Sequence, residues 1–124
     1  MKESAKSVFY FGIYLLFVGF TLLLLPNMLL GLFGISPAED VWVRVVGMLA
    51  FILGVYYITA ARNGLKAFIQ MSVYLRSSVI LFFGAFVGLG MVEPPLLLFG
   101  AVDLLGAAWT QLALRKEGRL APQI

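Results

Sequence analysis

The chain has 124 residues, of which 62% are hydrophobic and only 12% are charged, and its mean hydropathy is +1.02. So little polar surface cannot cover a soluble globule of this size, which excludes a water-soluble domain and indicates a membrane protein. The net charge of +3 does not indicate a nucleic-acid partner, because the basic residues fall at expected helix ends, as membrane topology requires. One domain of about four spans of some 20 residues each is predicted.

Two residue types that carry much protein chemistry are missing. The absence of cysteine excludes disulfides, thiolate nucleophiles and iron–sulfur clusters held by this chain. The absence of histidine removes the usual axial ligand of haem b, a common zinc ligand and the most versatile general base. The sequence also has no Gly-rich phosphate loop, nucleophile elbow or cluster of metal ligands. We therefore predict a protein that is not an enzyme and that holds no metal and no cofactor.

The first predicted span covers residues 8–25, which carry no charge. The apolar run continues too far for a signal peptide, and no convincing cleavage site follows it, so an uncleaved span is expected. Pro26 closes or kinks this helix, because proline removes a backbone donor and clashes with the preceding turn. Residues 28–36 are too few to span again. They are expected to form a short interfacial helix or to extend the first span obliquely.

Three further spans follow at residues 41–61, 73–92 and 95–114. Trp42 lies at the start of the second span, where an aromatic belt belongs. Residues 67–71 are expected to lie at the interface before the third span begins. Glu93 and the two prolines after it form a tight turn into the fourth span.

The basic residues set the predicted orientation. Eight of the nine fall on the side that four spans give to the termini and the second loop: Lys2, Lys6, Arg62, Lys66, Arg76, Arg115, Lys116 and Arg119. The opposite side holds Glu39, Asp40 and Glu93 with only Arg44. By the positive-inside rule the basic side is cytoplasmic. The prediction is an all-α polytopic protein of the cytoplasmic (inner) membrane, an antiparallel four-helix transmembrane bundle with both termini cytoplasmic.

Small residues indicate the helix faces that pack. Helices in lipid gain little from apolar burial against each other, so they approach closely where side chains are small. Each span has a stripe of glycines on one side, and the predicted packing positions are Gly12, Gly19, Gly47, Gly54, Gly84, Gly88, Gly100 and Gly106. The Gly84-x-x-x-Gly88 spacing is also typical of a dimer contact.

Asp103 is a carboxylate near the middle of the fourth span, where a charge in hydrocarbon costs roughly 2.5 to 3.5 kcal/mol. Arg44 is its obvious partner, because the second and fourth spans run in the same direction. Counted at about 1.5 Å per residue, Arg44 lies roughly 5 Å and Asp103 roughly 12 Å below the outer surface. An extended arginine covers that difference. The sequence therefore predicts an Arg44–Asp103 ion pair in the outer half of the bundle.

Three interpretations of this pair stay open. It fixes helix register as a structural contact, or it forms the polar floor of an outward-facing cavity that takes a ligand headgroup, an ion or a proton. In the third, Asp103 is neutral or Arg44 merely extends to the interface. A second candidate site is Arg76 with Thr110 and Gln111 at a similar depth near the cytoplasmic side. The alternative there is an arginine that reaches toward anionic headgroups.

Four features of the chain point to a known family: the four spans, the proline-ended first helix with its Leu32-Phe33-Gly34 segment, the Arg44-x-x-Gly47 motif and the Gly/Ala-rich fourth span. In these features the chain resembles the DoxX-like superfamily of small bacterial membrane proteins. The resemblance covers roughly residues 8–115 and implies an antiparallel four-helix membrane bundle. Members of that superfamily serve in different roles, which include a subunit associated with quinone-linked thiosulfate oxidation and proteins that resemble assembly chaperones or cargo receptors. Fold-level analogy therefore does not select a function.

The leading functional prediction is a small membrane binding or interaction protein. It holds a lipid-like or quinone-like ligand among membrane lipids, or steadies partner membrane proteins. A small transporter or channel that acts as a homodimer is the alternative, and an accessory subunit of a quinone-linked oxidoreductase is a third.

Overall fold

The computed structural model describes residues 1–35 and 41–120, with residues 119 and 120 described by their backbone alone. Glu39 and Asp40, which the sequence places on the outer side, lie outside the described residues. The described part contains the helices α1 (Glu3–Leu24), α2 (Pro26–Leu32), α3 (Trp42–Arg62), α4 (Lys66–Gly88) and α5 (Leu97–Leu120), with a 3-10 turn, η1 (Pro94–Leu96), before α5. Four segments are long and apolar enough to cross a membrane: α1, α3, α4 and Pro94–Gly118. The predicted all-helical class with four membrane-length segments is confirmed.

Proline and glycine set the helix boundaries. Pro26 is the first residue of α2, and Leu25 before it has a non-helical backbone, so α1 ends there and a separate short helix begins. Gly64 and Gly90 follow the ends of α3 and α4 with positive φ values of 61° and 72°, a conformation that glycine adopts without steric cost. No such residue interrupts 67–71, so this stretch is continuous with the rest of α4.

The closest packing lies between α1 and α3, along a seam of four glycines. Gly19 faces Gly47 and Gly12 faces Gly54, so the two backbones touch with no side chain between them. A Cβ added at Gly47 would lie 2.6 Å from the Leu23 nitrogen, and one at Gly19 would overlap the Phe51 backbone nitrogen. Any larger residue at these positions would force the helices apart.

The other predicted packing glycines divide into two groups. Gly100 lies against Ile80 of α4, and Gly106 lies against Phe11 and Arg76. Gly84 and Gly88, by contrast, contact no other described part of the chain, since a Cβ at either would meet nothing within 4 Å. Their expected place in the seams of the bundle is therefore wrong for this chain, because their face of α4 points away from α5.

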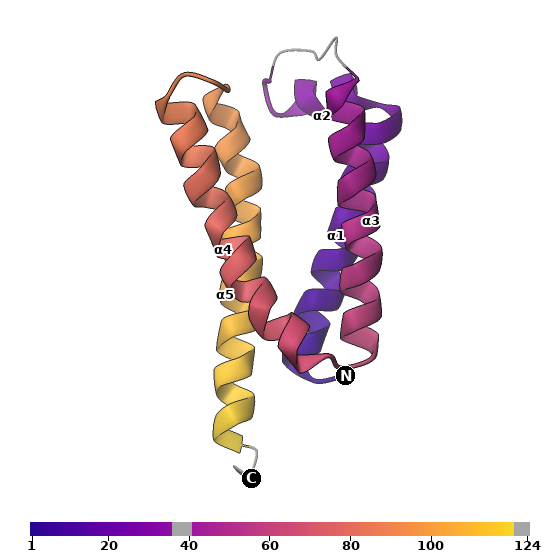
Figure 1. Ribbon diagram of the computed structural model, residues 1–124, viewed down its shortest axis with the longest axis vertical. Coiled ribbons are helices and arrows are strands. Elements are labelled where there is room, and N and C mark those ends of the chain that lie inside the picture. Colours follow the sequence, from indigo (N-terminus) through magenta and orange to yellow (C-terminus); the bar gives the residue numbers. More distant parts are fainter. Residues whose placement is uncertain (36–40, 121–124) are drawn as a thin grey trace.

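The helices form two pairs, α1 with α3 and α4 with α5 (Figure 1). The pairs diverge from the end that holds the α3–α4 loop, and the start of α1 and the end of α5 lie at that same end of the picture. Contact between the pairs runs mainly from α1 to α5, whereas α3 and α4 touch little and separate as they leave their shared loop. At the far end the ring of Phe33, which follows α2, lies 4.6 Å from that of Phe99 on α5.

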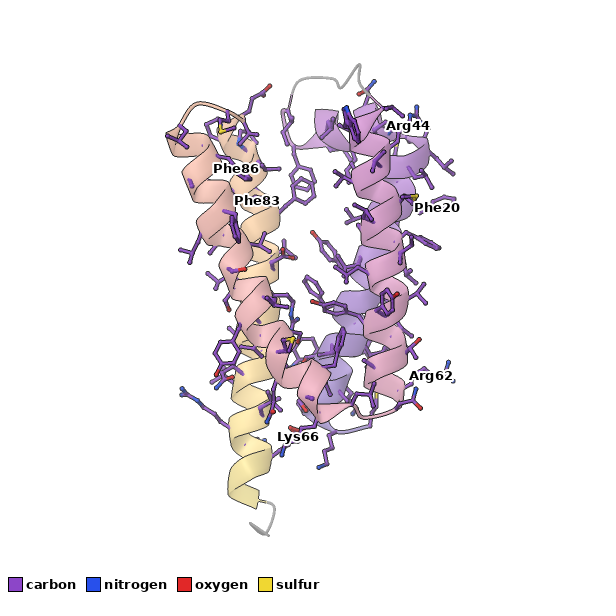
Figure 2. All side chains as sticks on the ribbon, in the orientation of Figure 1. Phe20, Arg44, Arg62, Lys66, Phe83 and Phe86 are labelled. Carbon is purple, nitrogen blue, oxygen red and sulfur yellow. The ribbon has the colours of Figure 1, made fainter. Side chains whose placement is uncertain are left out.

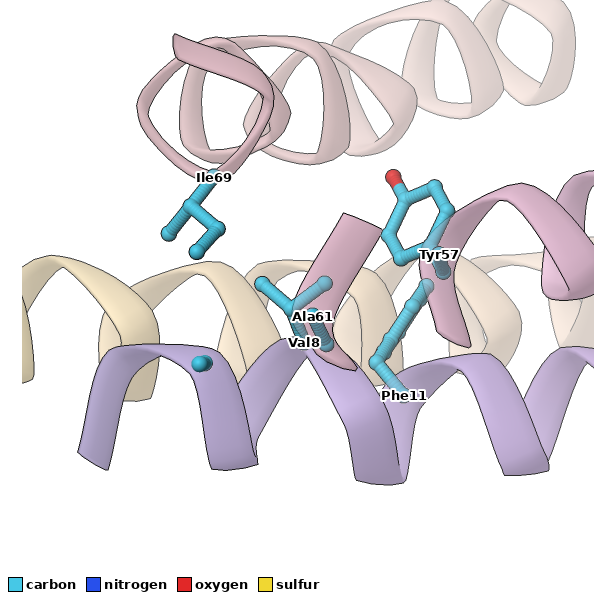
Figure 3. Close-up of a cluster of buried hydrophobic side chains, with 6 residues drawn as sticks. Val8, Phe11, Tyr57, Ala61 and Ile69 are labelled. Carbon is cyan, nitrogen blue, oxygen red and sulfur yellow. The ribbon is translucent and has the colours of Figure 1, made fainter. Parts of the chain in front are cut away.

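The buried apolar core sits where the two pairs converge (Figure 3). Six side chains from α1, α3 and α4 pack there: Ala5, Val8, Phe11, Tyr57, Ala61 and Ile69. Elsewhere most large apolar side chains of α3 and α4 are exposed, as expected for surfaces that face acyl chains. The fold is thus firmly joined at one end and more open along the gap between α3 and α4.

Candidate functional site

Arg44 does not meet Asp103. Its Nη1 donates hydrogen bonds to the carbonyl oxygens of Leu23, at 2.5 Å, and of Leu24, at 3.5 Å. These carbonyls belong to the last turn of α1, where a helix leaves its acceptors unpaired and where a cation is stabilised by the helix dipole. The predicted Arg44–Asp103 ion pair is therefore absent from the structure, and Arg44 instead caps the end of α1, far from Arg62 and Lys66 (Figure 2).

Arg76 is the arginine that enters the interior. Its side chain is only 2% exposed, although it lies on a helix whose face is otherwise largely open to lipid. Nε donates to the Ser72 carbonyl oxygen at 3.2 Å, and Nη2 donates to Ser72 Oγ at 3.1 Å and to Thr110 Oγ1 at 2.8 Å. The guanidinium carbon lies 4.8 Å from the centre of the Phe11 ring and 5.7 Å from that of Tyr57. Cation–π contact of this kind stabilises a desolvated guanidinium.

One nitrogen of this guanidinium has no partner. Arg76 Nη1 is buried and makes no hydrogen bond within the described part of the chain. It lies against α5 at Gly106, where a Cβ would come within 3.2 Å of it. A buried charged donor without an acceptor costs at least about 1 to 3 kcal/mol, so this atom is an unusual feature of the interior.

A chain of hydroxyl groups holds Arg76 in place. Thr110, which is fully buried on α5, shares a 2.6 Å hydrogen bond with Ser7 of α1, and Ser7 in turn donates to the Ser4 carbonyl oxygen at 2.6 Å. The contacts therefore tie α1, α4 and α5 together at one level. Gln111 is not part of this group, because it lines a separate surface depression with Gln70 and Arg115. Of the second candidate set, the structure brings together Arg76 and Thr110 and leaves Gln111 apart.

Arg76 and Asp103 share a cavity of about 260 Å³ to which all four long helices contribute. Most of its wall is apolar, with Leu15 from α1, Leu53 from α3 and Leu75 from α4 among the lining residues. Asp103 is half-buried and interacts electrostatically with Arg76, but no described residue donates a hydrogen bond to it. The cavity thus brings one cation and one carboxylate together within apolar walls, the usual composition of a small-molecule site.

The cavity lies beside the gap between α3 and α4. Its lining includes exposed side chains of both helices, Leu53 on α3 and Met71 and Leu75 on α4. These two helices contact each other little and diverge from their shared loop (Figure 1).

Sequence reasoning missed Ser7, Ser72 and Tyr57. Ser7 precedes the first predicted span, residues 8–25, although it lies inside α1 and is 1% exposed. A usable signal was present for Ser72, which lies four residues before Arg76 and therefore on the same face of α4. Nothing in the sequence marks Tyr57 as the tyrosine whose ring lies under the guanidinium.

Comparison of the chain with models of protein families, with curated proteins and with solved structures finds no match.

Proposed function

We propose that this chain is a membrane-embedded binding protein whose cavity takes the polar head of a lipid-like or quinone-like ligand. The observation that carries the proposal is the buried Nη1 of Arg76, which donates no hydrogen bond to any described residue. An arginine inside a membrane span is expensive, and where it occurs it usually serves a ligand, an ion or a proton. A carbonyl or hydroxyl oxygen of a ligand head would supply the acceptor that the chain does not.

The carboxylate of Asp103 narrows the chemistry of the proposed ligand. Asp103 lines the same cavity and has no donor in the described chain, so it suits a head that also carries a hydroxyl group. A quinol or a hydroxylated lipid head presents an acceptor to Arg76 and a donor to Asp103. The apolar walls suit a ring or short acyl segment, and the gap between α3 and α4 allows the tail to remain in the bilayer.

The membrane setting is part of the proposal. We place the chain in the cytoplasmic membrane with both termini and the α3–α4 loop inside, because Lys2, Arg62, Lys66 and Lys116 belong to that end. The proposal includes a relationship to the DoxX-like superfamily, which the chain resembles in sequence. Binding without catalysis is part of the proposal, since Arg76 cannot give up a proton and Asp103 is the one carboxylate among the described residues that line the cavity.

Native mass spectrometry of the chain extracted gently from membranes tests this function. We expect wild-type protein to retain an amphiphile with an oxygen-bearing head. Arg76→Gln should lower its occupancy about tenfold or more, because a charge-assisted hydrogen bond is lost. Arg44→Gln is the matched control and should keep the amphiphile, since Arg44 lies outside the cavity. Equal retention by both variants, or no bound molecule in wild type, would overturn the proposal.

A further inference from the structure

A second and larger cavity lies at the end of the molecule where the two helix pairs converge. It measures about 570 Å³ and is bounded by residues near the start of α1, by the α3–α4 loop and by the last turns of α5. It shares Ala5, Ala61 and Ile69 with the apolar core, but its lining contains neither Arg76 nor Asp103. Whatever occupies it is therefore separate from the ligand of the membrane-level cavity.

The charge of this cavity is strongly positive. Lys2, Arg62 and Lys66 line it, and Glu117 is its single acid, so three cations and one anion leave a net charge of +2. Glu117 already accepts a hydrogen bond from Ser4 Oγ at 2.9 Å. None of the three cations donates a hydrogen bond to, or forms an ion pair with, another residue that the structure describes. All three cations are exposed at the cavity, so they can pair with an outside anion.

Backbone N–H groups at the start of α4 add to the positive electrostatic potential of this cavity. α4 begins at Lys66, and its N-cap residue, Leu65, has no side chain that could accept a hydrogen bond. The first intrahelical donor is the Ile69 nitrogen, which bonds to the Leu65 carbonyl oxygen at 3.0 Å. The amides of residues 66–68 therefore have no acceptor inside α4, and the positive end of the helix dipole lies at the rim of the cavity. Gly64 beside it leaves open space, since a Cβ there would meet nothing within 4 Å.

The deep side of the cavity is apolar. Ala5, Ile69 and Leu114 form part of its wall, while the basic side chains come from the end of the molecule where Figure 2 shows Arg62 and Lys66. A free anion would use the charges and leave the apolar wall in contact with water. A phospholipid uses both, because its phosphate pairs with the cations and its glycerol and acyl chains cover the apolar residues.

We propose that this cavity binds the phosphate groups of an anionic phospholipid, and that a headgroup with two phosphates suits its net charge of +2 best. Arg62 and Lys66 neutralise the phosphates, the free amides of α4 donate hydrogen bonds to their oxygens, and the acyl chains leave along Ile69 and Leu114. The binding anchors the α3–α4 loop and fixes the lower end of the two helix pairs at the headgroup level of the membrane.

The test is lipid binding by purified chain in phosphatidylcholine nanodiscs that contain a minority of cardiolipin, followed by native mass spectrometry. Arg62→Gln/Lys66→Gln should bind cardiolipin about 25-fold more weakly than wild type, at about fivefold for each charge removed. Lys6→Gln/Lys116→Gln removes the same charge at the same end from exposed positions outside the cavity, and should change binding by less than about threefold.

Equal losses in the two double variants would overturn the proposal, since they would show general attraction to an anionic surface. Full displacement of cardiolipin by inorganic phosphate would also overturn it, because the apolar wall would then contribute nothing. Both double variants leave Arg76 and Asp103 intact, so the amphiphile of the membrane-level cavity should remain bound in each. Failure of the headgroup site is thus distinguishable from failure of the proposed function.

Discussion

Gly19→Leu should separate α1 from α3 and lower the free energy of unfolding by about 3 kcal/mol or more. Gly19 lies against the backbone of Gly47 and Phe51, with no flexible side chain between the two helices that could move aside. A leucine there must push two whole helices apart along a seam that Gly12 and Gly54 extend. The measurement is the loss of circular-dichroism helicity of the detergent-solubilised chain with increasing sodium dodecyl sulfate.

Gly84→Leu is the matched control, since it makes the same substitution in another membrane-length helix, about one turn before its end. Nothing lies within 4 Å of a Cβ at Gly84, so the free energy of unfolding should change by less than about 1 kcal/mol. If both substitutions destabilised the chain equally, the close contact between α1 and α3 would not be the feature that holds them together.

Arg76→Met/Asp103→Leu should leave the fold as stable as wild type or stabilise it by about 1 to 4 kcal/mol, while it abolishes retention of the ligand. The variant removes a guanidinium whose Nη1 has no partner in the described chain and a carboxylate that no described residue donates to. Ser7 and Thr110 keep their 2.6 Å hydrogen bond, so no hydroxyl is left unpaired. A gain in stability with a loss of binding is typical of residues that are kept for function.

The double variant is used because removal of Arg76 alone would leave Asp103 as an uncompensated charge in the interior. Stability is read from the same detergent titration, and binding from native mass spectrometry of the same preparation. A loss of more than about 3 kcal/mol would contradict this expectation, because it would mean that Arg76 and Asp103 serve mainly to hold the helices together.

The helical class and the close-packing glycines of α1 and α3 could be predicted from the sequence because both depend on local properties. Apolar length predicts a span whatever its neighbours are, and Gly12 and Gly19 allow close approach to any helix that faces them. What the sequence does not contain is which faces meet. Gly84 and Gly88 have the same spacing as many packing motifs, yet their side of α4 contacts nothing in the described chain.

The predicted Arg44–Asp103 ion pair is wrong because sequence spacing gives the depth of a residue along its helix but not the direction in which its side chain points around the helix axis. Arg44 and Asp103 belong to α3 and α5, but α5 packs mainly against α4 and α1. The break at Pro26 also leaves the final carbonyls of α1 near Arg44, which then has acceptors close by. Gln111 was misplaced for a related reason: it follows Thr110 directly, and adjacent residues lie about 100° apart around a helix, so they cannot both face Arg76.

Photocross-linking locates the ligand most directly. A quinone analogue with a diazirine on its head is reconstituted with the chain in lipid, activated by light, and mapped by peptide mass spectrometry. The account predicts that labels concentrate on cavity residues of separate helices, such as Leu15, Leu53 and Leu75, and disappear in Arg76→Gln. Labels spread over outer positions such as Leu49 and Leu81, unchanged by Arg76→Gln, would contradict the claim that the cavity between the helix pairs holds the head of a ligand.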